Sequence, residues 1–465
     1  MNNKNSCLNP IYILGAGPAG LAAGYTLSKQ GKPVVIVEKN KQVGGLSKSI
    51  NYQGFIVDYG AHFLATDHPL IKQFFDEILS SEQITIKRLT RFYWHYKYFS
   101  YPPQVKELFL DVGLVEIIKI ALSYLKYKVY PIDSPQNHEE ELQNKYGKYL
   151  YNIFFKDYLE KVWGCSCDRL TPGSITGRAN SFFKIWIETL LRKTTSFFSI
   201  GEASANYEYQ FQYPKLGLGQ FYKEIANYLL SKNQKILLNT EVIEIHQKHS
   251  KITQIVLKNY QTGQETVHNC EQIVSSIPIS LLVRQISPSA PEKIITAAKS
   301  LKFRNTILVY LIVDDYEIFP EHCLYINDSS VQLVRVTNYA NWSSYTMPNN
   351  YQTPICCEYW CDFHEKIWSL SEQELLLKAE KELRKIKIIG NQKISGGLVI
   401  KLPRTNPVYD IDYEEKKSEI QEYIDRFCNL QIIGRGGSFS YLDQDKVLLM
   451  GISAAKKLLE REKVI

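Results

Sequence analysis

Apolar residues recur along the chain with two different spacings, and these spacings predict an α/β protein. Short runs of apolar, mostly β-branched residues at Ile11–Leu14 and 33–37 predict two buried strands, with a helix over 21–27 between them. Helices are then expected over 108–130 and 142–162, where apolar residues follow a 3.6-residue period and Lys, Glu and Tyr lie opposite. The chain therefore opens as strand, helix, strand and continues into a helical region.

Strand patterns return near residue 235 and alternate with helices to the end of the chain. These strands are expected at 236–238, 241–245, 252–257, 273–277, 307–313, 332–337, 356–360, 398–401 and 430–433, and helices over 372–384 and up to residue 458. One further strand is expected before the helical region, at 92–99. A chain of 465 residues exceeds what one hydrophobic core supports. We predict a discontinuous nucleotide-binding domain (1–90, 205–300 and 403–465) and an inserted α+β substrate domain with a helical subdomain (91–204 and 301–402).

A glycine-rich turn follows the first strand and indicates a bound dinucleotide. Gly15, Gly17 and Gly20 fit the pattern GxGxxG, with Pro18 and Ala19 inside it. The first glycine permits the turn, the second admits a pyrophosphate, and the third lets the helix pack on the strand. Glu38 ends the second strand, where a carboxylate accepts hydrogen bonds from a ribose and disfavours a 2′-phosphate, and Lys39 follows it.

A second glycine pair, Gly44-Gly45-Leu46, provides bare backbone for an extended cofactor. From Ile11 to Leu46 the chain resembles the FAD-binding signature of amine oxidases, protoporphyrinogen oxidases and UDP-galactopyranose mutases. The resemblance implies FAD as cofactor and a Rossmann-like fold. Gln42 stands where these families usually carry arginine, so the chain departs from the signature at one secondary cofactor contact.

Later motifs extend the resemblance over nearly the whole chain and imply further site residues. The segment 58–63 resembles the stretch that passes the flavin, and the residues from 434 to 447 resemble the closing segment of the mutases. The cofactor contacts implied are Gly60, His62, Val242, Gly434, Asp445 and Val447. The substrate contacts implied are Trp163, Arg178, Tyr213, Tyr409, Arg435 and Tyr441, and His62 and Arg435 are the candidate catalytic residues.

The sequence contains no motif for a protein nucleophile, a hydrolytic zinc site or a P-loop, which fits an enzyme whose cofactor carries the difficult chemistry. We expect an FAD-dependent oxidoreductase that takes a hydride from an organic substrate. The alternative is a mutase-like isomerase that uses reduced FAD as a nucleophile. A third hypothesis is a scaffold that binds FAD without activity. Ala65 and Phe439 replace a histidine and a tyrosine of the mutases, which argues against the same substrate.

The composition and the net charge of the chain limit the kinds of ligand and partner that we expect. The formal net charge of +7 is a mild excess for this length, so we expect a small anionic ligand and no nucleic acid. Nine cysteines without CxxC spacing indicate neither a metal site nor a disulfide framework. Without a signal peptide, a cytoplasmic protein is expected. The segments 108–130 and 182–198 are basic and amphipathic, and two interpretations of them stay open. These helices cover the substrate domain with their polar faces toward solvent, or they bind peripherally to the inner face of a membrane. The oligomeric state is not indicated.

Overall fold

A five-stranded parallel sheet gathers strands from distant parts of the chain. The computed structural model describes residues 9–100, 113–173 and 210–464. The sheet order is β20-β13-β1-β2-β9, and every pairing in it is parallel. The strands are β1 (Ile11–Leu14), β2 (Val34–Val37), β9 (Lys235–Leu237), β13 (Ile273–Ser275) and β20 (Leu430–Ile432). The predicted α/β fold, with a sheet assembled from separated segments, is therefore confirmed.

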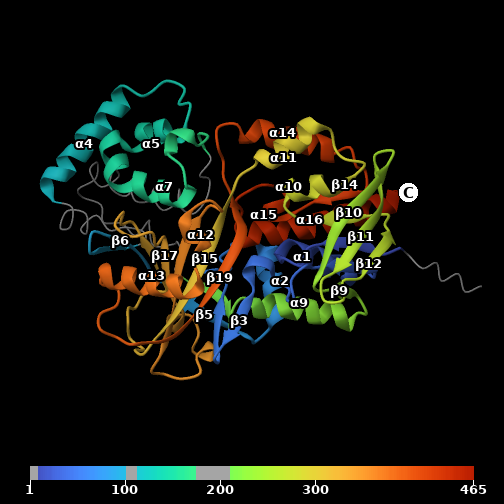
Figure 1. Ribbon diagram of the computed structural model, residues 1–465, viewed down its shortest axis with the longest axis horizontal. Helices are drawn as coiled ribbons and strands as arrows, with labels where there is room; N and C mark the ends of the chain where they lie inside the picture. The colour runs from blue at the N-terminus through green and yellow to red at the C-terminus, as the bar shows by residue number, and fades with distance from the viewer. Residues whose placement is uncertain (1–8, 101–112, 174–209, 465) are drawn as a thin grey trace, which may run out of the picture.

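Both faces of this sheet are buried, which explains why its strands are almost continuously apolar. Ile13 and Ile36 point to one face, which packs against α1 (Pro18–Lys29), α9 (Gly219–Ser231) and α16 (Gln444–Val464). Leu14 and Val37 point to the other face, toward a second sheet of order β12-β11-β10-β14. Its strands are β10 (Thr240–Lys248), β11 (Lys251–Asn259), β12 (Glu265–Asn269) and β14 (Ile286–Ser287). Figure 1 shows these layers on the side that carries the C-terminus.

A seven-stranded sheet of order β19-β15-β18-β17-β16-β6-β7 forms the second half of the molecule. Its strands are β6 (Thr90–Trp94), β7 (Lys97–Ser100), β15 (Phe303–Val313), β16 (Cys323–Ile326), β17 (Arg335–Asn338), β18 (Thr353–Cys361) and β19 (Ile394–Pro407). Helix α13 (Glu372–Lys385) packs on this sheet. β19 continues across residue 403, where a domain boundary was predicted, although its pairing with β15 shifts register between Leu402 and Asn406. The single strand predicted over 92–99 is wrong: His95 and Tyr96, both at positive φ, turn it into the β6–β7 hairpin.

A group of helices lies at the far end of this sheet, at the upper left of Figure 1. It contains α4 (Leu114–Val129), α5 (His138–Tyr146), α6 (Lys148–Leu150), a π-helical turn (Tyr151–Phe155) and α7 (Lys156–Trp163). The single helix predicted over 142–162 is wrong, because Gly147 breaks it at φ 78°. A Cβ there would lie 2.7 Å from the backbone nitrogen of Tyr124, so glycine allows α4 to approach. The predicted helix over 182–198 lies outside the described residues.

The remaining elements connect these units. The hairpin β3 (Ser49–Tyr52) and β4 (Phe55–Asp58) follows the second glycine pair, and β5 (Gln83–Lys87) pairs with β8 (Gln210–Pro214). The α-helices of the described residues that are not yet named are α2 (Pro69–Leu79), α10 (Ile279–Leu282), α11 (Glu292–Ser300), α12 (Lys366–Ser369), α14 (Tyr413–Ile424) and α15 (Gly434–Gly437). α11 and α14 pack together and lie at the top of Figure 1.

Candidate functional site

The candidate site is a cavity of about 520 Å³ between the carboxyl ends of the parallel strands and strand β19. Carboxyl ends of parallel strands are the usual ligand site of open α/β sheets. Among the predicted residues, those lining the cavity are Gly15, Gly17, Pro18, Ala19, Glu38, Lys39, Gly45, Leu46, His62, Val242, Gly434, Arg435 and Val447. Its lining carries five basic and two acidic side chains, which favours anionic ligands.

The two glycine turns meet at the cavity and need residues without side chains. Gly15 has φ 103°, and a Cβ there would lie 2.3 Å from the hydroxyl oxygen of Ser276. A Cβ on Gly20 would lie 2.0 Å from the Gly15 carbonyl oxygen, so this glycine lets α1 pack against the turn. Gly45 has φ 56°, and its Cβ would lie 3.0 Å from the Cα of Gly17. The first turn of α1 is therefore open to a phosphate, as predicted for a pyrophosphate.

Glu38 is held rigidly at the end of β2. One carboxylate oxygen accepts the N–H of Ala16 at 2.9 Å. The other accepts from the backbone and the side chain of Asn40, at 2.9 and 2.6 Å. The carboxylate is buried and keeps lone pairs for further donors, which fits contact with ribose hydroxyls.

Lys48 is a cavity residue that the sequence analysis missed. The residue is only 8% exposed, yet among the described residues its ammonium forms neither an ion pair nor a hydrogen bond, and it lies 5.0 Å from the centre of the Tyr59 ring. Burial lowers the pKa of Lys48, and Glu38 opposes this shift. Because no carboxylate forms an ion pair with this largely buried lysine among the described residues, the site favours an anionic group beside it, as FAD would supply. A lysine three residues after a glycine pair has no periodic signature that would have singled it out.

The N-terminus of α16 also faces the cavity, through Gln444 and Val447. Gln444 is fixed by hydrogen bonds with the hydroxyls of Ser47 and Tyr222, at 2.9 and 3.0 Å. A helix N-terminus carries partial positive charge and stabilises anionic groups nearby. Together with the glycine turns, Glu38 and Lys48, this arrangement fits a bound FAD.

Arg435 lines the same cavity from the short helix α15. Its guanidinium donates to the side-chain oxygen of Asn406 at 3.1 Å and to the Leu442 carbonyl at 2.7 Å. Its central carbon lies 4.8 Å from the centre of the Tyr441 ring. No carboxylate pairs with Arg435 in the part of the chain that the structure describes, so its positive charge is available to a ligand.

Three predicted substrate residues form an aromatic cluster behind Arg435 and do not line the cavity. The Trp163 ring lies 6.0 Å from Tyr409 and 6.4 Å from Tyr441, and the Tyr441 N–H donates to the Tyr409 hydroxyl. The indole N–H of Trp163 is buried without a partner among the described residues. In this structure the cluster positions Arg435 through Tyr441.

The other predicted residues lie around the cavity or away from it. Gly20, Gly44, Gly60 and Asp445 do not line it; Asp445 accepts from the Thr66 hydroxyl at 3.1 Å. Tyr213 is fully buried elsewhere, with its hydroxyl on Asp58 at 2.5 Å. Arg178 lies outside the described residues.

A wall formed by Phe303 and residues 400–405 of β19 was also missed by the sequence analysis. Pairing with β15 places β19 beside the cavity, and a register shift between Leu402 and Asn406 leaves residues 403–405 outside the ladder there. The apolar pattern at 398–401 predicted a strand but not its neighbour, so no signal in the sequence placed it at the cofactor cavity.

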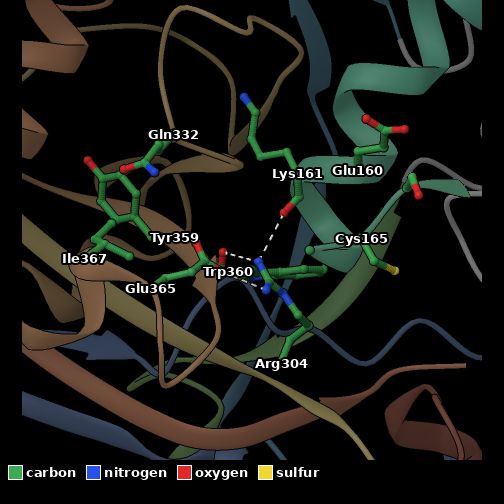
Figure 2. Close-up of a pocket in the computed structure, with 11 residues that line it drawn as sticks. Glu160, Lys161, Cys165, Arg304, Gln332, Tyr359, Trp360, Glu365 and Ile367 are labelled. Carbon is green, nitrogen blue, oxygen red and sulfur yellow. Dashed lines mark hydrogen bonds and ion pairs between the residues drawn. The ribbon is translucent and has the colours of Figure 1, made fainter. Parts of the chain in front are cut away.

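A second cavity of about 390 Å³ lies where α7 ends against β18. Figure 2 shows Arg304 in it, with its guanidinium between Glu365 and the backbone of Lys161 and Trp360. Arg304 is 2% exposed and pairs with Asp362 at 2.7 Å and Glu365 at 2.8 Å. It also donates to the Trp360 carbonyl at 2.7 Å and the Lys161 carbonyl at 3.4 Å. Arg304 thereby fixes the end of α7, which carries Trp163, to the seven-stranded sheet.

Comparisons with curated proteins find oxidases and a mutase among the relatives. An L-amino acid oxidase of Bothrops pictus is 24% identical over 325 residues, which cover 67% of this chain and 61% of the oxidase. A probable UDP-galactopyranose mutase of Klebsiella pneumoniae is 28% identical over 184 residues, or 38% of this chain and 45% of the mutase. The chain thus spans less than two thirds of these relatives.

Solved structures share the fold over almost the whole chain. A reduced UDP-galactopyranose mutase superposes with a TM-score of 0.80 at 18% identity, covering 97% of this chain and 94% of the mutase. A putative protoporphyrinogen oxidase from Exiguobacterium sp. 255-15 gives 0.71 at 14% identity, covering 97% and 98%. A model of the flavin-containing amine oxidoreductases matches residues 18–394. The chain therefore belongs to the flavin-containing amine oxidoreductase family and uses FAD as its cofactor.

Proposed function

We propose that this protein is an FAD-dependent oxidoreductase that takes a hydride from an organic donor carrying an anionic group. The observation that carries this proposal is Arg435. Its guanidinium lines the cofactor cavity, its hydrogen-bond acceptors are neutral, and no described carboxylate balances its charge. A carboxylate or phosphate on the donor would complete that pairing through charge-assisted hydrogen bonds.

The donor would bind where Arg435, His62 and the β19 wall face one cavity. The glycine turns, Glu38 and Lys48 would hold the FAD, which would supply the acceptor for the hydride that leaves the donor, while the protein supplies position and electrostatics. Arg435 would orient the donor by its anionic group. His62, which lines the same cavity, would contact the donor or the cofactor. The name of the Bothrops pictus relative, an oxidase of L-amino acids, supports a donor with a carboxylate.

The test is anaerobic flavin reduction by two matched series of donors. For Arg435→Met we expect the Michaelis constant of amino-acid donors to rise tenfold or more, on the order of one lost charge-assisted hydrogen bond. Neutral amines of the same carbon skeleton should be affected much less, and Arg435→Lys should recover part of the loss. Equal effects on the charged and the neutral series would contradict the role of Arg435 and the proposed substrate class.

A mutase-like isomerase is the second candidate, because an unbalanced arginine also suits the diphosphate of a sugar nucleotide. Against it, Phe439 is fully buried against the Phe303 ring, 5.0 Å away, and does not line the cavity. Product analysis separates the two functions. Dithionite-reduced protein incubated with UDP-galactopyranose should leave the sugar unchanged, and conversion to the furanose form would establish the mutase.

A further inference from the structure

Helix α4 carries a stripe of exposed apolar side chains along its outer face. These are Leu114, Val115, Ile118, Leu122, Leu125 and Val129, each between 50% and 66% exposed. From Val115 onward the spacing is three, four, three and four residues, so the side chains form one continuous face. Single exposed apolar residues are ordinary on proteins, whereas a contiguous row of this length marks an interaction surface.

The opposite face of α4 holds the helix to the protein, largely by polar contacts. Ser123 accepts the N–H of Tyr149 at 2.9 Å, and Tyr127 donates to Gln143 at 3.0 Å. Ile120 is the one buried residue among those of the helix. Surface helices normally turn their apolar face inward, so the orientation of α4 is reversed. Figure 1 shows α4 at the outer edge of the molecule, with α5 and α7 on its inner side.

The charges beside the stripe are basic. Lys119, Lys126 and Lys128 stand on the helix, against Glu116 as its one acid. Glu116 is already paired with Lys119 at 2.8 Å. Lys126 and Lys128 have no carboxylate partner among the described residues; each lies over a tyrosine ring, at 6.0 and 5.5 Å. The outer surface of the helix is therefore apolar with a net positive border.

We propose that α4 docks this protein on the surface of an anionic lipid bilayer, with the stripe in the headgroup boundary and the lysines on the phosphates. Helices that lie in a membrane interface combine an apolar face with basic flanks. Among the described helices, none is long and apolar enough to cross a bilayer, so the contact would be with one leaflet. A second copy of the chain is less suited, since two such faces would bring like charges together.

The test is flotation of the purified full-length holoprotein with vesicles. We expect it to float with vesicles that contain about one third phosphatidylserine, to float less as salt rises, and to bind pure phosphatidylcholine at least tenfold more weakly. The triple variant Ile118→Ser, Leu122→Ser, Leu125→Ser should lose binding tenfold or more. The control triple variant Leu230→Ser, Leu377→Ser, Ile411→Ser changes equally exposed residues on other elements and should float like wild type.

Lys126→Gln with Lys128→Gln should reduce the preference for the anionic lipid. Failure of wild type to float, or equal flotation of the stripe variant, would overturn the proposal. The melting temperature and the particle mass of the stripe variant test two other occupants of this face, a segment of the same chain and a second copy of the protein. A stripe variant that melts several degrees lower points to a segment of this chain covering α4, and one that halves the particle mass points to a second copy. Either result would also overturn the proposal.

Discussion

Gly45 occupies the point where the two glycine turns of the cavity approach each other, and the lack of a side chain there keeps the cofactor path open. Gly45→Ala would place a Cβ 3.0 Å from the Gly17 Cα at φ 56°. Gly31→Ala is the matched control, because φ is 72° and a Cβ meets no described atom. Both should lose about 1–2 kcal/mol of unfolding free energy through the left-handed backbone. FAD content per protein should fall only in Gly45→Ala; an equal content in both variants would contradict this account.

Asp58 is a fully buried carboxyl that receives the hydroxyls of Ser49 and Tyr213, both at 2.5 Å, and the N–H of Leu218 at 2.9 Å. Burial raises its pKa from 3.8 to about 6, against the opposing hydrogen bonds. Between pH 4 and 6 the folded state therefore holds more protons than the unfolded state. This group should lower the unfolding free energy as pH rises, by up to about 3 kcal/mol.

Denaturant melts at pH 4 and pH 6 measure this effect. Asp58→Asn should remove most of the pH-dependent loss that this group causes, although the variant is less stable overall. Asp67→Asn, at an exposed aspartate, should keep the wild-type pH dependence. If Asp58→Asn retains the full loss between the two pH values, the raised pKa is assigned to the wrong group.

At the residue scale, the cavity glycines and Glu38 could be predicted because each follows from a local requirement of backbone or ribose. Lys48 could not, because its burial depends on Tyr59, a neighbour across the β3–β4 hairpin. The substrate residues were predicted from resemblance, and only Arg435 among those described lines the cavity. Trp163 and Tyr409 lie behind Arg435 and do not line the cavity. A sequence motif does not indicate how far from the cavity such a residue lies.

At the scale of elements, the end of α7 depends on a glycine that accommodates Arg304. Gly164 ends the helix at φ 71°, and a Cβ there would lie 1.9 Å from a guanidinium nitrogen of Arg304. Gly173→Ala is the control, since φ is 73° and a Cβ meets no described atom. Both variants should share the backbone cost of about 1–2 kcal/mol, and Gly164→Ala should lose a further 1–3 kcal/mol or so from overpacking. Equal unfolding free energies of the two variants would contradict this prediction, because they would show that the Arg304 side chain moves aside without loss of stability.

Helix boundaries in the same region illustrate why periodicity alone was insufficient. The apolar spacing over 142–162 is helical almost throughout, yet the chain forms α5, α6, a π-helical turn and α7. The break at Gly147 serves the approach of α4, a helix that ends 18 residues earlier. The periodicity of apolar residues indicates which face of a helix is apolar. It does not indicate where packing against a distant element, here α4, requires the helix to end.

For the whole molecule, the parallel sheet was predictable because its strands and glycine turns carry strong local signals. The seven-stranded sheet was not, since its order depends on contacts between distant segments. The N–H of Ala61, beside the cavity, donates to Glu358 at 3.3 Å, although 297 residues separate them. Lys161 likewise ties α7 to the loop between β16 and β17, donating to the carbonyls of Asp328 at 2.8 Å and Leu333 at 3.0 Å. The cavity itself is lined from both halves of the fold, by the glycine turns of the parallel sheet and by Phe303 and residues 400–405 of the seven-stranded sheet.

The central claim is that this cavity holds FAD ready to accept a hydride from an anionic organic donor. The most direct measurement is the anaerobic visible spectrum of the purified protein, before and after addition of NADPH and then of L-amino acids as carboxylate donors. The account predicts flavin bands at about 370 and 450 nm that NADPH leaves unchanged and that a carboxylate donor bleaches. Absence of the bands would contradict the cofactor assignment, and bleaching by NADPH with none by any carboxylate donor would contradict the proposed oxidoreductase.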